Sequence, residues 1–123
     1  MSKSEKLPYE PANQVFLRGM VASAPVVRRL PSGDELCAFR LTVPRPPGDP
    51  STSRVRVDSI DCASTRATVR RSALRWVQGD VVEVSGALRR RFWRTPAGPA
   101  ARRYEVAAAT VRRAVNSGRR TGA

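Results

Sequence analysis

Hydrophobic and polar residues alternate along most of this chain, which is the pattern of half-buried β-strands. It is clearest between positions 35 and 45, where Cys37, Phe39, Leu41 and Val43 alternate with smaller or polar residues. We expect five strands: 15–21 with a short continuation over 26–30, then 35–45, 54–63, 79–93 and 102–111.

Proline, glycine and serine separate these strands. The sequence PSGD at 31–34 is a strong hairpin signal. The stretch 46–53, PPGDPSTS, cannot be a strand interior, because proline lacks the backbone donor and glycine lacks a side chain. A further turn is expected over 95–101. Gly19 and Gly86 lie inside strands, where we expect them to permit coiling or bulging.

One segment has the helical period instead. A single apolar stripe recurs there at i, i+4, i+7 and i+8, formed by Val69, Ala73, Trp76 and Val77. Ser64 or Thr65 is expected to cap the start of this helix, and the glycine–aspartate pair at 79–80 to end it. Because Trp76 and Phe39 both lie on apolar stripes, we expect both in the core.

The expected order is therefore three strands, a helix and two strands. This is the order of the OB-fold, an all-β, five-stranded Greek-key barrel, here with one α-helix between strands 3 and 4, whose exposed face binds oligonucleotides. We place the OB-fold domain at 13–115, between a flexible N-terminal arm at 1–12 and a short, basic, disordered tail at 116–123.

The net charge of +13 favours a polyanionic partner, through electrostatic attraction and counterion release. All but two of the 23 basic residues are arginine, whose planar guanidinium binds phosphate and stacks on bases. No apolar run has the length of a membrane span, and the N-terminal segment lacks the features of a signal peptide. We therefore expect a cytoplasmic, nucleoid-associated protein without membrane contact.

The sequence lacks the residues of a typical enzyme. Histidine is absent, which removes the most common general base and metal ligand, and the ten carboxylates are scattered. We expect no catalytic residue, no metal and no cofactor. Cys37 and Cys62 would face each other in a hairpin about 46–53, so a disulfide is conceivable, but inside the cell we expect them reduced and buried.

The strand at 79–93 starts apolar and ends in a basic, aromatic segment. One face of its first part is formed by Val82, Val84, Gly86 and Leu88. By strand parity, Arg89, Arg91 and Trp93 then share one face. Two guanidinium groups beside a large ring suit a single nucleic-acid strand, since they supply charge for phosphates and a plane for an exposed base.

Several short segments follow one another in order: 13–19 (NQVFLRG), 24–28 (APVVR), 31–33 (PSG), 38–41 (AFRL), 79–91 (GDVVEVSGALRRR) and Glu105–Val106. In this order and spacing they resemble the bacterial single-stranded-DNA-binding protein family over roughly 13–113. The resemblance implies an OB-fold, assembly usually as a homotetramer, and sequence-independent binding of single-stranded DNA.

The resemblance carries over only part of the family's binding site. Trp93 matches a base-stacking aromatic at the end of the fourth strand, whereas Val57 and Ala63 stand where the third strand of the family has aromatics. The chain also ends in a basic tail where the family has an acidic tip. We therefore expect a paralogue or a truncated variant that does not recruit replication proteins through such a tip.

Our first hypothesis is a homo-oligomer, tetramer or dimer, that binds single-stranded DNA without sequence preference in replication, repair or recombination. Trp93 would stack a base between Arg89 and Arg91. Further arginines would follow the phosphates: Arg40, Arg45, Arg54, Arg56 and Arg94. The alternative is an OB-fold adaptor with weak single-strand affinity that acts through protein contacts or RNA.

Overall fold

The computed structural model describes residues 6–48, 55–95 and 98–115, without the side chains of 92–95, 99–102 and 115, and these ranges hold six strands and one helix. In chain order they are β1 (Val15–Val21), β2 (Val26–Arg29), β3 (Glu35–Pro44), β4 (Val57–Ser64), α1 (Ala67–Ala73), β5 (Val81–Thr95) and β6 (Gly98–Val115). The expected continuation of the first strand is the separate strand β2. The expected position of the helix, between the β3–β4 pair and the last two strands, is confirmed.

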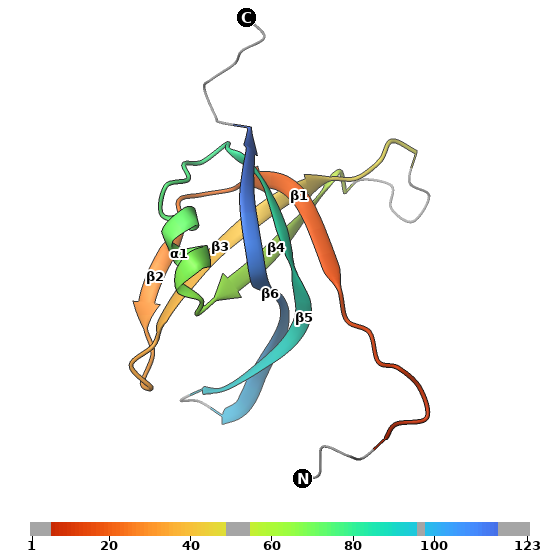
Figure 1. Cartoon of the computed structure of the whole chain (residues 1–123), viewed down its shortest axis with the longest axis vertical. Coiled ribbons are helices and arrows are strands. Elements are labelled where there is room, and N and C mark those ends of the chain that lie inside the picture. The colour runs from red at the N-terminus through yellow and green to blue at the C-terminus, as the bar shows by residue number, and fades with distance from the viewer. Residues whose placement is uncertain (1–5, 49–54, 96–97, 116–123) are drawn as a thin grey trace, which may run out of the picture.

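The strands form one curled sheet (Figure 1). Its order is β1-β5-β6-β4-β3-β2, and an additional pairing of β1 with β3 closes it into a barrel. β4 and β6 run parallel, whereas the other described pairs are antiparallel. Gly19 lies near the closure, and a Cβ atom there would stand only 2.7 Å from the carbonyl oxygen of Thr42. A larger residue at Gly19 would hold β1 and β3 apart.

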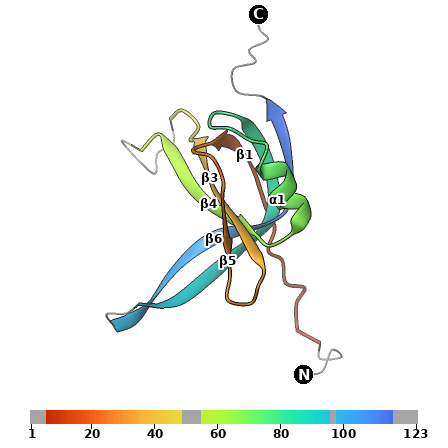
Figure 2. The ribbon, with the colours of Figure 1, turned by 90° about the vertical axis from the view of Figure 1, so that its left-hand side faces the viewer.

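The long β5–β6 hairpin bends at Gly86. The pairing shifts register between Ser85 and Gly86, and a Cβ atom on Gly86 would overlap the carbonyl oxygen of Ala107. Beyond this bulge the two strands leave the barrel as an arm, which we define as residues 89–95 and 98–105 (Figure 2). Leu88, at the base of the arm, is 45% exposed, so the apolar face expected over 82–88 ends before it.

The turn at the tip of the arm is shorter than the expected 95–101. β5 continues to Thr95 and β6 already begins at Gly98, then runs past the expected end at Val111 to Val115. The backbone ladder continues through Trp93 opposite Ala101 and Thr95 opposite Gly98. Alternation of hydrophobic and polar residues does not reveal these strand ends, because it indicates which face of a strand is buried and not how far the backbone pairing continues.

The inner faces of the strands fill the barrel as their alternation predicts. Phe39 is 6% exposed and Trp76 is 4% exposed, so the expectation that both lie in the core is confirmed. The buried residues around them come from the helix and from every strand except β2: Val21, Cys37, Leu41, Cys62, Val69, Ala73, Val82, Val84, Val106 and Ala108.

The helix differs from the expected one at both ends. Its N-cap is Arg66, and the Ser64 hydroxyl accepts a hydrogen bond from the backbone N–H of Arg66 (3.0 Å) instead of capping the helix itself. After Leu74 the backbone bonds shorten to i→i−3, and this tighter winding rotates Val77 off the apolar stripe, leaving it 54% exposed. Trp76 therefore reaches the core from a turn. No helix within the described ranges has the length and apolar character needed to cross a membrane.

The two cysteines do not face each other. β3 and β4 pair with Cys37 opposite Ser64 and Cys62 opposite Phe39, two residues away from the expected register. The segment between the two strands spans 45–56, so its centre lies one residue beyond the centre of the expected loop. Both thiols are free and buried, as expected for reduced cysteines.

Candidate nucleic-acid interface

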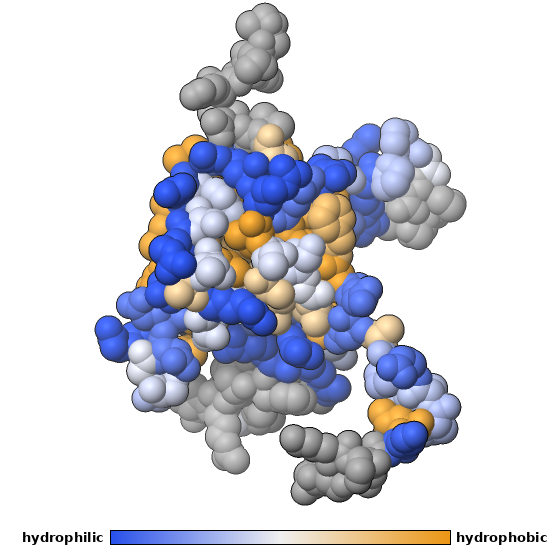
Figure 3. Space-filling model, in the orientation of Figure 1, coloured by the Kyte–Doolittle hydropathy of each residue, from blue (hydrophilic) through white to orange (hydrophobic). Residues whose placement is uncertain are grey.

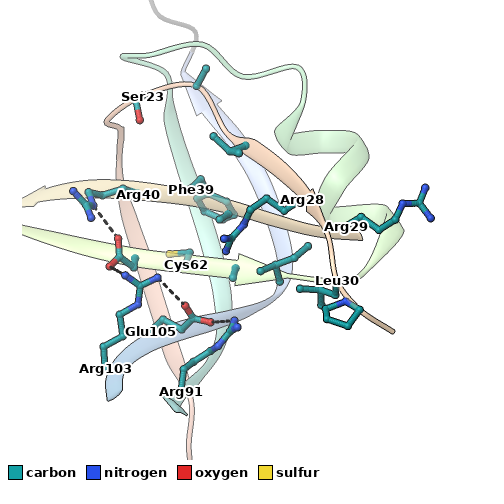
Figure 4. Close-up of a pocket in the computed structure, with 17 residues that line it drawn as sticks. Ser23, Arg28, Arg29, Leu30, Phe39, Arg40, Cys62, Arg91, Arg103 and Glu105 are labelled. Carbon is teal, nitrogen blue, oxygen red and sulfur yellow. Dashed lines mark hydrogen bonds and ion pairs between the residues drawn. The ribbon is translucent and has the colours of Figure 1, made fainter. Parts of the chain in front are cut away.

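A groove of about 690 Å³ crosses the outer face of the barrel between β2 and the base of the arm (Figure 4). β3 and β4 form its floor, where Ala38 is paired with Ala63 and Arg40 with Asp61. Arg28 of β2 lines one side. Its other side carries three residues from the arm: Arg91, Arg103 and Glu105. Segments far apart in the sequence therefore supply one surface.

Charged side chains form a continuous chain of alternating sign along this groove (Figure 4). Arg40 Nε donates to Asp61 Oδ1 at 2.8 Å, and Arg103 Nη1 lies 3.6 Å from Asp61 Oδ2. Arg103 Nη2 lies 3.9 Å from Glu105 Oε1, and Arg91 Nη1 donates to Glu105 Oε2 at 2.9 Å. Three guanidinium groups thus share two carboxylates.

The two carboxylates are more enclosed than the guanidinium groups. The Glu105 side chain is only 6% exposed and that of Asp61 27%, whereas the side chains of Arg40, Arg91 and Arg103 are 54%, 40% and 51% exposed. A buried carboxylate needs charged partners, because an uncompensated charge out of water is costly. The arginines compensate these charges and still reach solvent.

Cys62 also lines the groove, where its thiol is a weak nucleophile. Burial raises the pKa of its thiol to about 12, with smaller contributions from the carboxylates of Asp61 and Glu105. Near neutral pH the sulfur is therefore a protonated thiol, and a thiol is a much weaker nucleophile than a thiolate.

Of the arginines predicted from the sequence, the structure brings Arg40 and Arg91 into the groove. Arg89 follows the same side of β5 two residues earlier and is exposed. Within the described part of the chain no hydrogen bond or ion pair involves its side chain.

Two other predicted arginines lie at the far end of the β3–β4 pair. Arg45 donates two hydrogen bonds to Asp58, from Nη2 at 2.7 Å and from Nε at 3.1 Å. Asp58 is three residues from Asp61 on β4, so it lies on the opposite face of that strand. Arg56 is exposed, and its carbonyl oxygen accepts a hydrogen bond from the Arg45 backbone N–H. Neither residue lines the groove.

The remaining predicted residues are Trp93, Arg94 and Arg54. The backbone of Trp93 is paired with Ala101 near the tip of the arm, but its side chain and that of Arg94 lie outside the description. Arg54 lies outside the described residues altogether. Their role in binding stays a prediction.

Sequence reasoning missed Asp61, Arg103 and Glu105. The pair Glu105–Val106 stands out only as a point of resemblance, and nothing local marks its carboxylate as a partner of Arg91. One feature could have identified Asp61: residues that face each other on paired strands, such as Arg40 and Asp61, have complementary charges. That signal can be used only once the register is known.

Comparison with known proteins identifies the family and agrees with the fold. The family model described as "Single-strand binding protein family" matches residues 12–114. Among solved structures, the "Plasmodium falciparum SSB complex with ssDNA" superposes with a TM-score of 0.72 at 18% identity, covering 88% of this chain and 99% of that chain. This likeness confirms the OB-fold. None of the curated proteins matches the chain. Since the family model spans most of its length, the chain belongs to the single-strand binding protein family.

Proposed function

We propose that this protein binds single-stranded DNA without sequence preference, along the groove and the arm. The observation that carries the proposal is the match of the family model over 12–114, on a barrel whose outer face gathers half-exposed arginines. The similar Plasmodium falciparum structure is itself described as a complex with single-stranded DNA. We infer binding and not catalysis, since the groove thiol of Cys62 is protonated near neutral pH and the chain has no histidine.

In this proposal the arm and the groove contact different parts of the nucleic-acid strand. Arg89 on the arm is exposed and suits a phosphate, and Trp93 further along supplies a plane for one base. The groove holds the next part of the strand beside Arg40 and Arg91. The net charge of +13 attracts the polyanion and releases its counterions.

We also propose that the protein assembles with itself through β1. On one side 15–20 pair with β5, while on the other side, among the described residues, only Met20 and Val21 pair with β3. Phe16 and Met20 are 56% and 46% exposed, and Figure 3 shows apolar atoms gathered in the middle of the face turned to the viewer, with hydrophilic atoms around them. An open strand edge beside exposed apolar residues favours association. We propose a dimer or tetramer, and its place in replication, repair or recombination is part of the same proposal.

One observation favours the alternative, an OB-fold adaptor with weak single-strand affinity that acts through protein contacts or RNA. Among the described lining residues, the one aromatic is Phe39, and it is buried. Loss of stacking rings weakens single-strand binding, since each stacked base contributes about 1–3 kcal/mol.

A titration of intrinsic tryptophan fluorescence with oligo-dT and oligo-U of equal length tests both candidates. We expect saturable binding of oligo-dT and weaker binding of a DNA duplex of the same length, which serves as the control. Equal affinity for duplex and single strand would contradict the proposal, and a clear preference for oligo-U would favour the adaptor that acts on RNA.

A further inference from the structure

The carboxylates in the groove are unexpected on a surface that binds a polyanion. Asp61 and Glu105 cancel the charge of two of the three arginines that they contact. If those arginines served only to attract phosphates, both carboxylates would weaken binding by repulsion. The chain as a whole has a large excess of arginine, so charge alone does not require arginines in this arrangement.

The geometry of the contacts points to another role. A guanidinium group is planar, and its N–H donors point outward in that plane. The hydrogen bonds from Arg40 Nε to Asp61 and from Arg91 Nη1 to Glu105 therefore hold each group by its edge. An edge contact leaves the two flat faces uncovered by the carboxylate, and both arginine side chains remain about half exposed.

A flat guanidinium face is a surface on which a nucleic-acid base can stack. The groove needs such surfaces, because Ala63 lines it without a ring and its one described aromatic, Phe39, belongs to the core. A free arginine side chain would have to be ordered when a base arrives. A carboxylate that already fixes the guanidinium lowers this entropic cost.

We propose that Asp61 and Glu105 are positioning residues for base stacking: they fix the guanidinium groups of the groove by their edges, so that the flat faces receive DNA bases. This inference rests on the proposed function. In a phosphate track the arginines recognise the backbone of the strand, whereas here they recognise its bases. The two roles predict opposite effects of Asp61→Asn.

Arg40→Lys keeps the charge and removes the planar face. We expect it to weaken binding of oligo-dT by about five-fold or more at both low and high salt, as for loss of one stacked base. Asp61→Asn adds a positive charge but releases Arg40 and Arg103 from their anchor. We expect this variant to bind more weakly than the parent at 0.5 M salt, where screening removes most of the added attraction.

The chain offers a matched control outside the groove. Arg18 Nε donates to Glu83 Oε2 at 2.8 Å, so the donor atom and the distance are those of the Arg40–Asp61 hydrogen bond. Neither Arg18 nor Glu83 lines the groove. Arg18→Lys and Glu83→Gln therefore repeat the loss of a planar guanidinium group and the loss of a carboxylate charge elsewhere. We expect both to bind like the parent, with light scattering used to verify that every variant has the parent's mass.

An abasic oligonucleotide of the same length separates stacking from a general structural effect. It retains the phosphates, so the ratio of its Kd to that of oligo-dT reports base contacts. We expect this ratio to fall about five-fold in Arg40→Lys and in Asp61→Asn, and to stay unchanged in the controls. An unchanged ratio in the groove variants, or tighter binding by Asp61→Asn at both salt concentrations, would overturn the inference and leave the proposed function intact. A parent that does not bind oligo-dT would refute both.

Discussion

The rings of Phe39 and Trp76 meet edge to face, with centroids 5.1 Å apart and planes at 89°. This contact joins the inner face of β3 to the turn after α1, and both residues are almost fully buried. Arg40, the next residue on β3, points to the opposite face and into the groove. The strand that carries the core ring therefore also sets the position of a candidate DNA contact.

Trp76→Ala should lower the free energy of unfolding by about 3–5 kcal/mol, because it removes a large core side chain and its edge-to-face contact. Urea unfolding followed by circular dichroism measures the change. Trp76→Phe keeps a ring beside Phe39 and should cost clearly less. A Trp76→Ala protein as stable as the parent would mean that the turn after α1 does not hold the barrel.

Trp93→Ala should act in the opposite way and weaken binding of single-stranded DNA by about 1–3 kcal/mol, the usual contribution of one stacked base. Trp93 lies near the tip of the arm and follows Arg89 and Arg91 at two-residue spacing along β5, which motivates this expectation. Fluorescence anisotropy of a labelled oligo-dT gives the affinity.

The melting temperature of Trp93→Ala should stay close to that of the parent, and this guards against mistaking unfolding for lost binding. Trp76→Ala is the comparison, since it should lose stability first. If Trp93→Ala binds like the parent while its melting temperature collapses, the ring belongs to the core and the binding site lies elsewhere.

The sequence is a good guide to which face of a strand a residue occupies, because that face depends on local alternation. Cys37, Phe39 and Leu41 are buried and Arg40 is exposed, as their spacing on β3 predicts. Val77 breaks the rule for a local reason, since the tighter winding after Leu74 is not visible in the spacing of apolar residues.

The groove could not be predicted in the same way, because it depends on register between distant strands. The expected register, with Cys37 opposite Cys62, would place Arg40 opposite Ser59. The actual register places it opposite Asp61. A shift of two residues keeps every side chain on its face and changes every partner. The ion-paired chain is a property of the register, so alternation alone cannot reveal it.

Stability should fall at alkaline pH through the buried thiol of Cys62. Burial raises its pKa from the ordinary 9.0 to about 12, so between these values the unfolded chain loses a proton that the folded protein keeps. Ionisation then favours the unfolded state as pH rises, by up to about 1.4 kcal/mol per pH unit. The full contribution is retained below pH 9.

Urea unfolding at pH 7.5 and pH 10 tests this for the parent and for Cys62→Ala. The parent should lose about 1.4 kcal/mol more than the variant between the two pH values. Equal losses would show that the Cys62 thiol ionises as readily in the folded protein as in the unfolded chain.

The protein should not be a monomer in solution. The open edge of β1 at 15–19 and the exposed Phe16 and Met20 beside it supply the surface for self-association. Light scattering across a concentration series should give a multiple of 13.5 kDa. Phe16→Glu should shift the equilibrium toward the monomer, and a constant mass near 13.5 kDa for the parent would contradict the prediction.

Binding of oligo-dT should depend steeply on salt. On single strands the slope of log K against log salt is about −0.7 for each phosphate neutralised, so several arginine contacts give a steep line. The groove refines this expectation, because Arg40 and Arg91 are already paired with carboxylates and Arg89 has no such partner in the described part of the chain.

Arg89→Gln should therefore make the slope shallower by about 0.7, the contribution of one phosphate contact, whereas Arg40→Lys should lower the affinity and leave the slope unchanged. Titrations at four or more salt concentrations distinguish the two effects. A shallow slope in the parent together with tight binding would mean that stacking provides most of the affinity. If the slope changes equally in both variants, Arg40 neutralises a phosphate as Arg89 does, despite its ion pair with Asp61.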